Sequence, residues 1–345
     1  MRTALVAHEG GDREAEDRAW LWCIELDEGS DAALKGKPDL PPFRLRPYLI
    51  HAENLRERGD APAALMILDR ALVRWPDDAD AHLLAGQCHE SQADWGRAEA
   101  AFRRSVELDP SASACVLLAH SLDKLGRGHE AVEWLHHSLV VDPDYEESHY
   151  NLGCLQEQDG NIDAAIERFR RALEIDPDYA DAHARIGSLL LRRALHSTLA
   201  QDHVDWPLAF GHLCSATKLQ PEDGWSHARL ASMCETAKHL DDAEGHHRAA
   251  TRLLPDVAVV WAHLGNFLSL RGADQEAETA LRHAVSLEPD NAFVRFWLGK
   301  HLWYATGDDE GRTELLRAHD LGDPRALAWL SEREAEDGDG DSDGA

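Results

Sequence analysis

The sequence predicts an all-α solenoid built from antiparallel helix pairs. Prolines recur at spacings of 34, 33, 34, 44, 34 and 34 residues, and five of the seven follow a short helical run that ends in an acidic or polar residue. Because proline cannot continue a helix and restricts the residue before it, each proline marks a helix end. The recurring prolines are Pro76, Pro110, Pro143, Pro177, Pro221, Pro255 and Pro289.

Two helical patterns lie within each period. The first has a small residue where two helices must cross closely. The second has two small residues seven positions apart, on one face of the helix, with a bulky residue between them. The small residues of the first pattern are Ala52, Gly86, Ala119, Gly153, Gly187, Ala231, Gly265 and Gly299. The bulky residues of the second are Leu68, Phe102, Leu135, Phe169, Leu213, His247 and Leu281. The turns between the patterns are predicted to hold left-handed glycines at Gly59, Gly126, Gly160 and Gly272.

This pattern resembles the tetratricopeptide repeat family. Trp261, Leu264, Gly265, Ala277 and Pro289 match the family's spacing within one period. The resemblance covers about four-fifths of the chain and implies a right-handed superhelical solenoid. It also implies that the first helices line a concave groove that binds a protein or peptide segment.

The chain divides into five predicted parts. Trp20 aligns with the bulky position of a second helix, and Asp323-Pro324 is a good helix start after the last repeat. In order, the parts are a degenerate N-terminal half-repeat at 1–28, a Pro-rich insertion at 29–44, eight repeats at 45–322 with an insertion at about 194–207, a capping helix at 323–335, and an acidic disordered tail at 336–345.

The acidic composition limits the possible partners. The formal charge is −29, from 64 acidic and 35 basic residues. We therefore expect no nucleic acid and no anionic membrane surface as partner, because both require clustered Lys and Arg. No apolar run approaches the roughly 18 residues of a membrane helix. The six cysteines form no CxxC pair. Reduced thiols in a cytoplasmic protein are therefore expected.

No catalytic, cofactor or metal site is predicted. The sequence has no Gly-rich phosphate loop, no GxSxG elbow and no HExxH or CxxC spacing, so we expect a protein that is not an enzyme. Neighbours such as His246 and His247 diverge by about 100° on a helix and do not share an ion easily. One histidine column is predicted to be structural and to face the neighbouring repeat: His82, His149, His183 and His227.

The predicted groove changes character along the chain. Its first third is apolar, its middle is polar and basic, and its far end is aromatic. Small residues such as Ala184 and Ala228 would leave room there for a partner backbone. The candidate groove residues are Leu49, Ile50, Leu83, Leu84, Val116, Leu117, Tyr150, Asn151, Arg185, Arg192, Arg229, His263, Asn266, Phe296 and Trp297.

Each part of the groove also has a purely structural interpretation. The two central arginines could pair with Asp181 and Glu235, and the apolar doublets could contact the Pro-rich insertion. The aromatic end could seal the last repeat against Trp329. The family's capture of a C-terminal carboxylate needs a set of Lys and Asn side chains, and Lys124 with Asn151 does not complete it.

The preferred hypothesis is a non-catalytic adaptor or scaffold that binds a partner segment in its groove. The alternative is a structural or regulatory subunit of a stable complex or homo-oligomer, beside a separately encoded enzyme. The sequence leaves the oligomeric state and the identity of the partner open.

Overall fold

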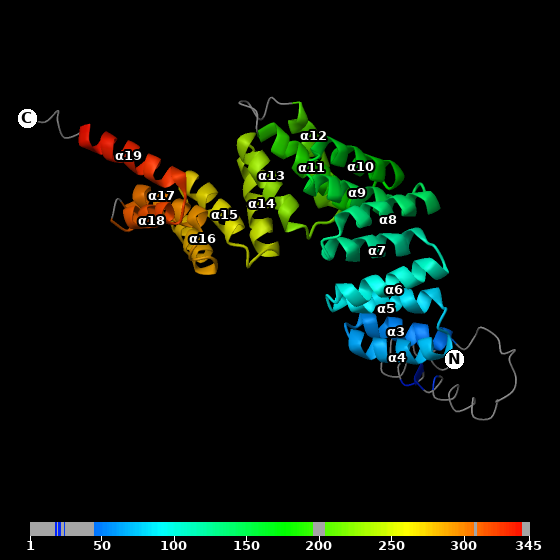
Figure 1. The fold of residues 1–345 in the computed structure, drawn as a ribbon. Coiled ribbons are helices and arrows are strands. Elements are labelled where there is room, and N and C mark those ends of the chain that lie inside the picture. Colours follow the sequence, from blue (N-terminus) through cyan, green and yellow to red (C-terminus); the bar gives the residue numbers. More distant parts are fainter. Residues whose placement is uncertain are drawn as a thin grey trace, which may run out of the picture. The chain divides into compact units, whose positions relative to one another are not determined.

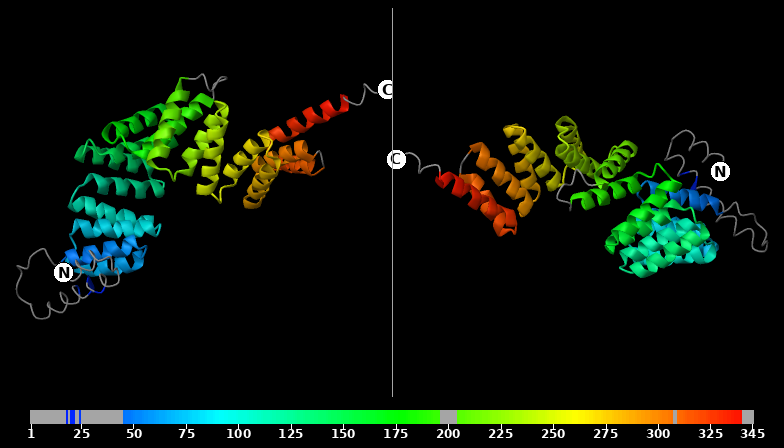
Figure 2. Two further views of the ribbon diagram at one scale, coloured as in Figure 1. Left: turned by 180° about the vertical axis from the view of Figure 1, so that it is seen from behind. Right: turned by 90° about the horizontal axis from the view of Figure 1, so that it is seen from above.

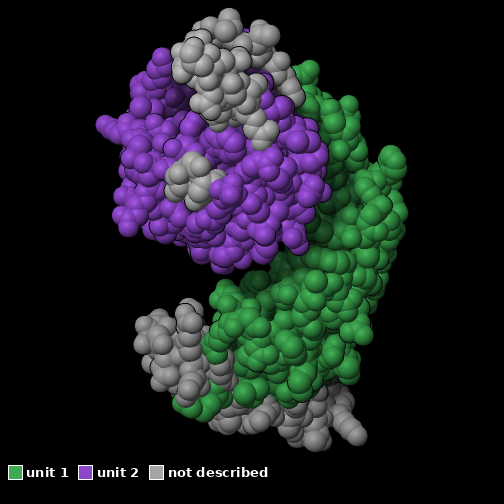
Figure 3. Space-filling view, turned by 90° about the vertical axis from the view of Figure 1, so that its left-hand side faces the viewer, with its two compact units in different colours: residues 1–177 green, residues 178–345 purple. Residues whose placement is uncertain are grey.

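A computed structural model of the chain describes residues 18, 20, 21, 24, 45–195, 204–306 and 309–339 (Figure 1). All regular structure in these residues is helical, and the helices pack as adjacent pairs, so the predicted all-α solenoid is confirmed. The chain divides into two compact units, 1–177 and 178–345, which Figure 3 distinguishes by colour. Each unit is treated separately below.

Among its described residues, the first unit contains four helix pairs, which follow one another from blue through cyan to green in the left view of Figure 2. The pairs are α3 (Arg46–Glu57) with α4 (Ala61–Arg74), α5 (Ala79–Ser91) with α6 (Trp95–Leu108), α7 (Ala112–Lys124) with α8 (Gly128–Val141), and α9 (Glu146–Gln158) with α10 (Ile162–Ile175).

The described part of the second unit contains four pairs and a final single helix. The pairs are α11 (Ala180–Leu195) with α12 (Asp205–Leu219), α13 (Gly224–Thr236) with α14 (Leu240–Leu253), α15 (Ala258–Leu270) with α16 (Asp274–Leu287), and α17 (Ala292–Thr306) with α18 (Asp309–Asp320). The single helix is α19 (Pro324–Asp339). None of the helices among the described residues is long and apolar enough to cross a membrane.

The N-terminal predictions fall mostly outside the described residues. Trp20 and Ile24 are described, and both are buried. Ile24 packs into the same core cluster as residues of α3, α4 and α5. The remainder of the predicted half-repeat and the whole Pro-rich insertion at 29–44 lie outside the described part of the chain.

Small residues allow the paired helices to approach closely, as the sequence predicts. A Cβ atom on Gly86 would stand 2.4 Å from the Phe102 ring, and one on Gly153 would stand 2.7 Å from the Phe169 ring. Both distances are far below van der Waals contact. A glycine on the first helix therefore fits directly against the bulky residue of the second helix.

The predicted left-handed turns are confirmed. Gly59, Gly126, Gly160 and Gly272 all have φ between 75° and 81°. Two other turns use the same backbone region without glycine, since φ is 56° at Ala93 and 62° at Lys238. Residues with a Cβ are strained in this region.

The start of α12 differs from its predicted position. The sequence places Trp206 and Pro207 at the end of a loop, but α12 begins at Asp205 and includes both in its first turn. Asp205 is buried and accepts two hydrogen bonds from Arg193 of α11, one of them 2.9 Å from Nη2 to Oδ1. That ion pair fixes the helix start. Residues 196–203 of the predicted insertion lie outside the described residues.

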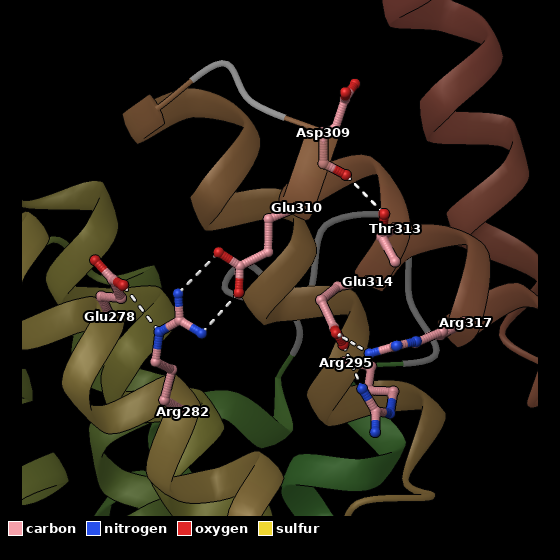
Figure 4. Close-up of polar contacts among 8 residues, drawn as sticks. All are labelled: Glu278, Arg282, Arg295, Asp309, Glu310, Thr313, Glu314 and Arg317. Carbon is pink, nitrogen blue, oxygen red and sulfur yellow. Dashed lines mark hydrogen bonds and ion pairs between the residues drawn. The ribbon is translucent and has the colours of Figure 1, made fainter.

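Charged side chains connect the last helices of the second unit (Figure 4). Arg282 of α16 donates to both carboxylate oxygens of Glu310 on α18, at 2.8 and 3.1 Å. Glu314 of α18 is buried, and it accepts hydrogen bonds from Arg295 of α17 and from Arg317, the latter at 2.6 Å. The helix α19 then continues to Asp339, beyond the predicted end of the capping helix at 335.

Candidate functional site

A hollow in the first unit brings together four of the predicted apolar residues. Its volume is about 320 Å³, and α3 and α5 supply all of its walls. Leu49 and Ile50 of α3 and Leu83 of α5 are half-buried, whereas Leu84 is 7% exposed and belongs to the core. The polar wall residues are Glu53, Asn54, Asp80 and Gln87.

The third apolar doublet does not line this hollow. Val116 of α7 is 5% exposed and is part of a core cluster with Phe102 and Leu118. Leu117 is half-buried and packs against the same cluster. Both side chains of the doublet therefore pack against the core of the unit.

Tyr150 and Asn151 of α9 are both engaged within the first unit. The Tyr150 ring lies 5.4 Å from the Phe169 ring. The Asn151 side chain donates from Nδ2 to the carbonyl of Glu147 at 2.8 Å, one turn earlier in the same helix. Asn151 also lines a small hollow of about 40 Å³ together with His120 and Cys154.

The predicted basic residues belong to the second unit. Arg185 and Arg192 of α11 are exposed, and Arg229 of α13 is half-buried. His263 of α15 is exposed, and the centre of its ring lies 5.3 Å from that of the Phe293 ring. Asn151 belongs to the first unit, whereas these basic residues belong to the second. They therefore form a set that does not include Asn151.

A second sizeable hollow lies between α15 and α17, with a volume of about 390 Å³. Asn266 and Trp297, two predicted groove residues, line it together with Lys300, His301 and Tyr304. The Lys300 ammonium lies 4.8 Å from the centre of the Trp297 ring. The hollow therefore combines a cation–π pair with the Asn266 amide.

Phe296 is not a surface residue of the groove. It is 5% exposed, and the Arg325 guanidinium of α19 lies 4.4 Å from its ring centre. Trp329 of α19 also packs edge-on against Trp303 at 5.6 Å. The predicted aromatic end is thus partly covered by α19, as the structural interpretation of this cluster expected.

The histidine column closes the turns before the first helices. Nε2 of His82, His149 and His227 lies 2.8, 3.3 and 3.2 Å from the carbonyl of the proline six residues earlier. Trp261 makes the same contact to Pro255 at 2.8 Å. The column was predicted to face the neighbouring repeat, and that prediction is wrong for His183 and His227, which face the second helix of their own pair.

The second helix of the same pair supplies the facing side chains instead. His183 of α11 meets His212 of α12, and His227 of α13 meets His246 of α14. Burial lowers the pKa of His246, with a smaller contribution from His227. Sequence reasoning missed both pairs, because their members stand 29 and 19 positions apart.

The buried thiols of Cys88 and Cys115 are poor nucleophiles. Burial raises the pKa of Cys88 and of Cys115 to about 11, so both remain protonated at neutral pH. Among the described residues, no cluster of three or more His, Cys, Asp or Glu side chains has the arrangement of a metal site.

Two segments of the chain match profiles of known protein families. Residues 51–113 match a family profile described as a tetratricopeptide repeat, and residues 158–192 match a second one described as a TPR repeat. Both matches fall on the helix pairs described above. The chain therefore contains stretches similar to tetratricopeptide repeats. A search of curated protein sequences finds no match.

Solved structures share the tetratricopeptide repeat fold. A chain of the APC/C hetero-tetramer Cut9–Hcn1 is 18% identical with a TM-score of 0.60, covering 82% of this chain and 52% of that one. This chain therefore spans about half the length of that relative. A monomeric IFIT1 mutant with m7Gppp-AAAA is 14% identical with a TM-score of 0.53, covering 93% and 80%. The pilF protein of Pseudomonas aeruginosa is 18% identical with a TM-score of 0.54, covering 61% and 92%.

The matched repeats support a scaffold for protein–protein interaction in general, with protein or peptide partners. They also point to a non-enzymatic repeat protein. These solved structures are at most 18% identical to this chain, so they show a shared fold and no shared function.

Proposed function

We propose that the first unit of this repeat protein binds a partner segment through an apolar side chain that enters the hollow between α3 and α5. The observation that carries the proposal is the convergence of Leu49, Ile50 and Leu83 on one hollow of about 320 Å³. A cavity of this volume accommodates side chains, and burying one Leu or Phe contributes about 1.5–3 kcal/mol.

The charge at the hollow favours a basic partner. Glu53 and Asp80 stand among the apolar walls, and Asp80 is exposed. Glu53 is paired with Arg56 at 2.5 Å, so Asp80 is the carboxylate better placed to meet an incoming cation. The net charge of −29 adds long-range attraction. The expected segment therefore has an apolar anchor flanked by Lys or Arg.

The second unit is proposed to contact a partner through polar groups. Arg185, Arg229 and His263 stand on the first helices of three successive pairs, beside the small residues Ala184 and Ala228. Guanidinium groups bind carboxylates and carbonyls through charge-assisted hydrogen bonds of about 1.5–3 kcal/mol. Acidic side chains or exposed backbone of a partner fit this surface.

A peptide selection tests the proposal for the first unit. Random peptides displayed on phage are selected on the purified full-length chain, and the enriched peptides are measured by fluorescence anisotropy. We expect an apolar residue with neighbouring Lys or Arg in the enriched set. Ile50→Glu should weaken their binding by at least about tenfold, because it places a charge among the apolar walls.

Val73→Glu is the matched control. Val73 lies on α4, outside the hollow, and is 84% exposed, so the same charge change there should leave binding unaltered. Equal weakening by Ile50→Glu and Val73→Glu would show that net charge, and not the hollow, governs binding. An enriched set without apolar residues would refute the proposed anchor.

A further inference from the structure

Two histidine pairs face each other across consecutive helix pairs of the second unit. The two Nδ1 atoms of His183 and His212 are 2.9 Å apart, and those of His227 and His246 are also 2.9 Å apart. The ring centroids lie 5.0 and 5.1 Å apart, and the ring planes meet at 44° and 41°. All four side chains are half-buried. The same geometry thus occurs twice, at equivalent positions of neighbouring repeats.

A backbone contact fixes the tautomer of His227. Its Nε2 atom lies 3.2 Å from the carbonyl oxygen of Pro221, which accepts but cannot donate a hydrogen bond. Nε2 therefore carries the proton of the neutral ring, and Nδ1 presents a lone pair toward His246. Metal-binding histidines are oriented in this way, with the second ring nitrogen donating to a carbonyl or carboxylate.

The distance between the Nδ1 atoms suits two ligands of one metal ion. Metal–imidazole bonds are about 2.0–2.1 Å long, so two such ligands at a right angle stand about 2.9 Å apart. A tetrahedral angle would separate them by about 3.3 Å. Right-angled nitrogen ligands are typical of square-planar or octahedral Ni²⁺ and Cu²⁺.

We propose that each pair, His183 with His212 and His227 with His246, is a two-histidine site for a divalent transition-metal ion of the Ni²⁺ or Cu²⁺ type. Within the described residues no third His, Cys, Asp or Glu completes a larger cluster, so water fills the other coordination positions. In the metal-free chain, His246 donates its Nδ1 proton to His227. Metal binding moves that proton to Nε2 of His246.

The next repeat supplies an internal comparison. Trp261 replaces the first histidine, donates to the Pro255 carbonyl at 2.8 Å and meets His283 at a centroid distance of 4.6 Å. A ring contact between the two helices is thus present, with His283 one turn beyond the position of His246, but indole nitrogen is only a donor and cannot bind a metal ion. His283 is therefore a matched residue outside the proposed sites.

The test measures Ni²⁺ binding to the full-length chain after removal of any polyhistidine tag. By equilibrium dialysis, the native chain should bind two equivalents that His212→Gln with His246→Gln removes, and His246→Gln alone should remove one. His283→Gln should retain both. Ni²⁺ should raise the melting temperature of the native chain and of His283→Gln, but not that of the double variant, because an ion that binds the folded state stabilises it.

Two outcomes would overturn the proposal. One is a double variant that binds Ni²⁺ with the native stoichiometry, and the other is a native chain without Ni²⁺ stabilisation. Glutamine keeps a donor for the facing histidine, so circular dichroism should show a folded variant. If the variant does not fold, electron paramagnetic resonance of the native chain with Cu²⁺ decides. Coupling to two imidazole nitrogens supports the site, and its absence contradicts it.

Discussion

The position six residues after five of the recurring prolines holds a side-chain N–H donor that reaches the carbonyl of that proline. His82, His149, His227 and Trp261 all reach the carbonyl of their proline from this position, and Arg295 does the same through Nε to Pro289. Imidazole, indole and guanidinium share little except that donor. The hydrogen bond therefore explains the column better than its aromatic character does.

Backbone strain at single residues leads to the first prediction. Ala93 has φ of 56°, where other turns in the chain use glycine. The left-handed conformation costs a residue with a Cβ about 1–2 kcal/mol, and the greater freedom of glycine in the unfolded chain offsets part of that gain. Ala93→Gly should therefore raise the free energy of unfolding by about 0.5–1 kcal/mol, measured by urea denaturation.

The reverse substitution is the control for this prediction. Gly126 has φ of 75° and open space around its Cα, so Gly126→Ala should lower the free energy of unfolding through strain alone. A destabilised Ala93→Gly variant would contradict the strain argument. Lys238, with φ of 62°, provides an independent repetition in the second unit.

At the scale of elements, the last helix pair keeps a close contact between its two helices. Gly311 stands at the first small position of the second pattern, where the earlier pairs have alanine. A Cβ on Gly311 would stand 2.6 Å from the backbone nitrogen of Trp303, and one on Gly299 would stand 2.8 Å from Leu315. Glycine here allows α17 and α18 to approach each other even more closely than alanine would.

The ion pairs of these helices differ in burial, and this gives the second prediction. The side chains of Arg295 and Glu314 are 13% and 9% exposed, whereas those of Arg282 and Glu310 are 45% and 46% exposed. Removing one partner of a buried pair leaves an uncompensated charge, at a cost of about 3 kcal/mol or more. Exposed pairs contribute at most about 1 kcal/mol.

We therefore expect Glu314→Ala to lower the free energy of unfolding by about 3 kcal/mol, and Glu310→Ala to lower it by less than about 1 kcal/mol. Both substitutions remove one carboxylate from α18, so their difference isolates the effect of burial. Chemical denaturation of the two variants measures it. Equal losses would show that burial of Glu314 does not determine the strength of its pair.

The sequence predicted the elements well, because prolines, small residues and turn glycines repeat with a fixed period. It located the apolar hollow for the same reason, since Leu49 and Leu83 occupy equivalent positions on α3 and α5. It offered the cover of the aromatic end by Trp329 only as an alternative and did not predict the contact of Arg325 with Phe296, because that contact depends on the direction in which α19 leaves α18. Pairs such as His227 with His246 also require the packing of two helices, which a search for short spacings does not detect.

At the scale of the whole molecule, the distribution of charge matters more than its sum. The chain carries a formal charge of −29, yet Arg185, Arg192 and Arg229 gather on the first helices of the second unit. Cations on these helices would attract acidic groups that the rest of the surface repels, and this local effect declines over about one Debye length, roughly 8–10 Å. Binding to this surface should therefore depend on where a positive charge is removed.

This dependence gives the last prediction. Arg185→Ala with Arg229→Ala should weaken the binding of acidic peptides to the chain by at least about tenfold, because two charge-assisted hydrogen bonds are lost. The control is Arg248→Ala with Arg252→Ala, which removes the same charge from α14, a second helix of the same unit. Fluorescence anisotropy at two salt concentrations distinguishes loss of local contacts from loss of net charge. A variant that has lost local contacts should bind weakly at both salt concentrations. If the two double variants bind equally, net charge alone governs the attraction, and the basic residues of the first helices do not form a binding surface.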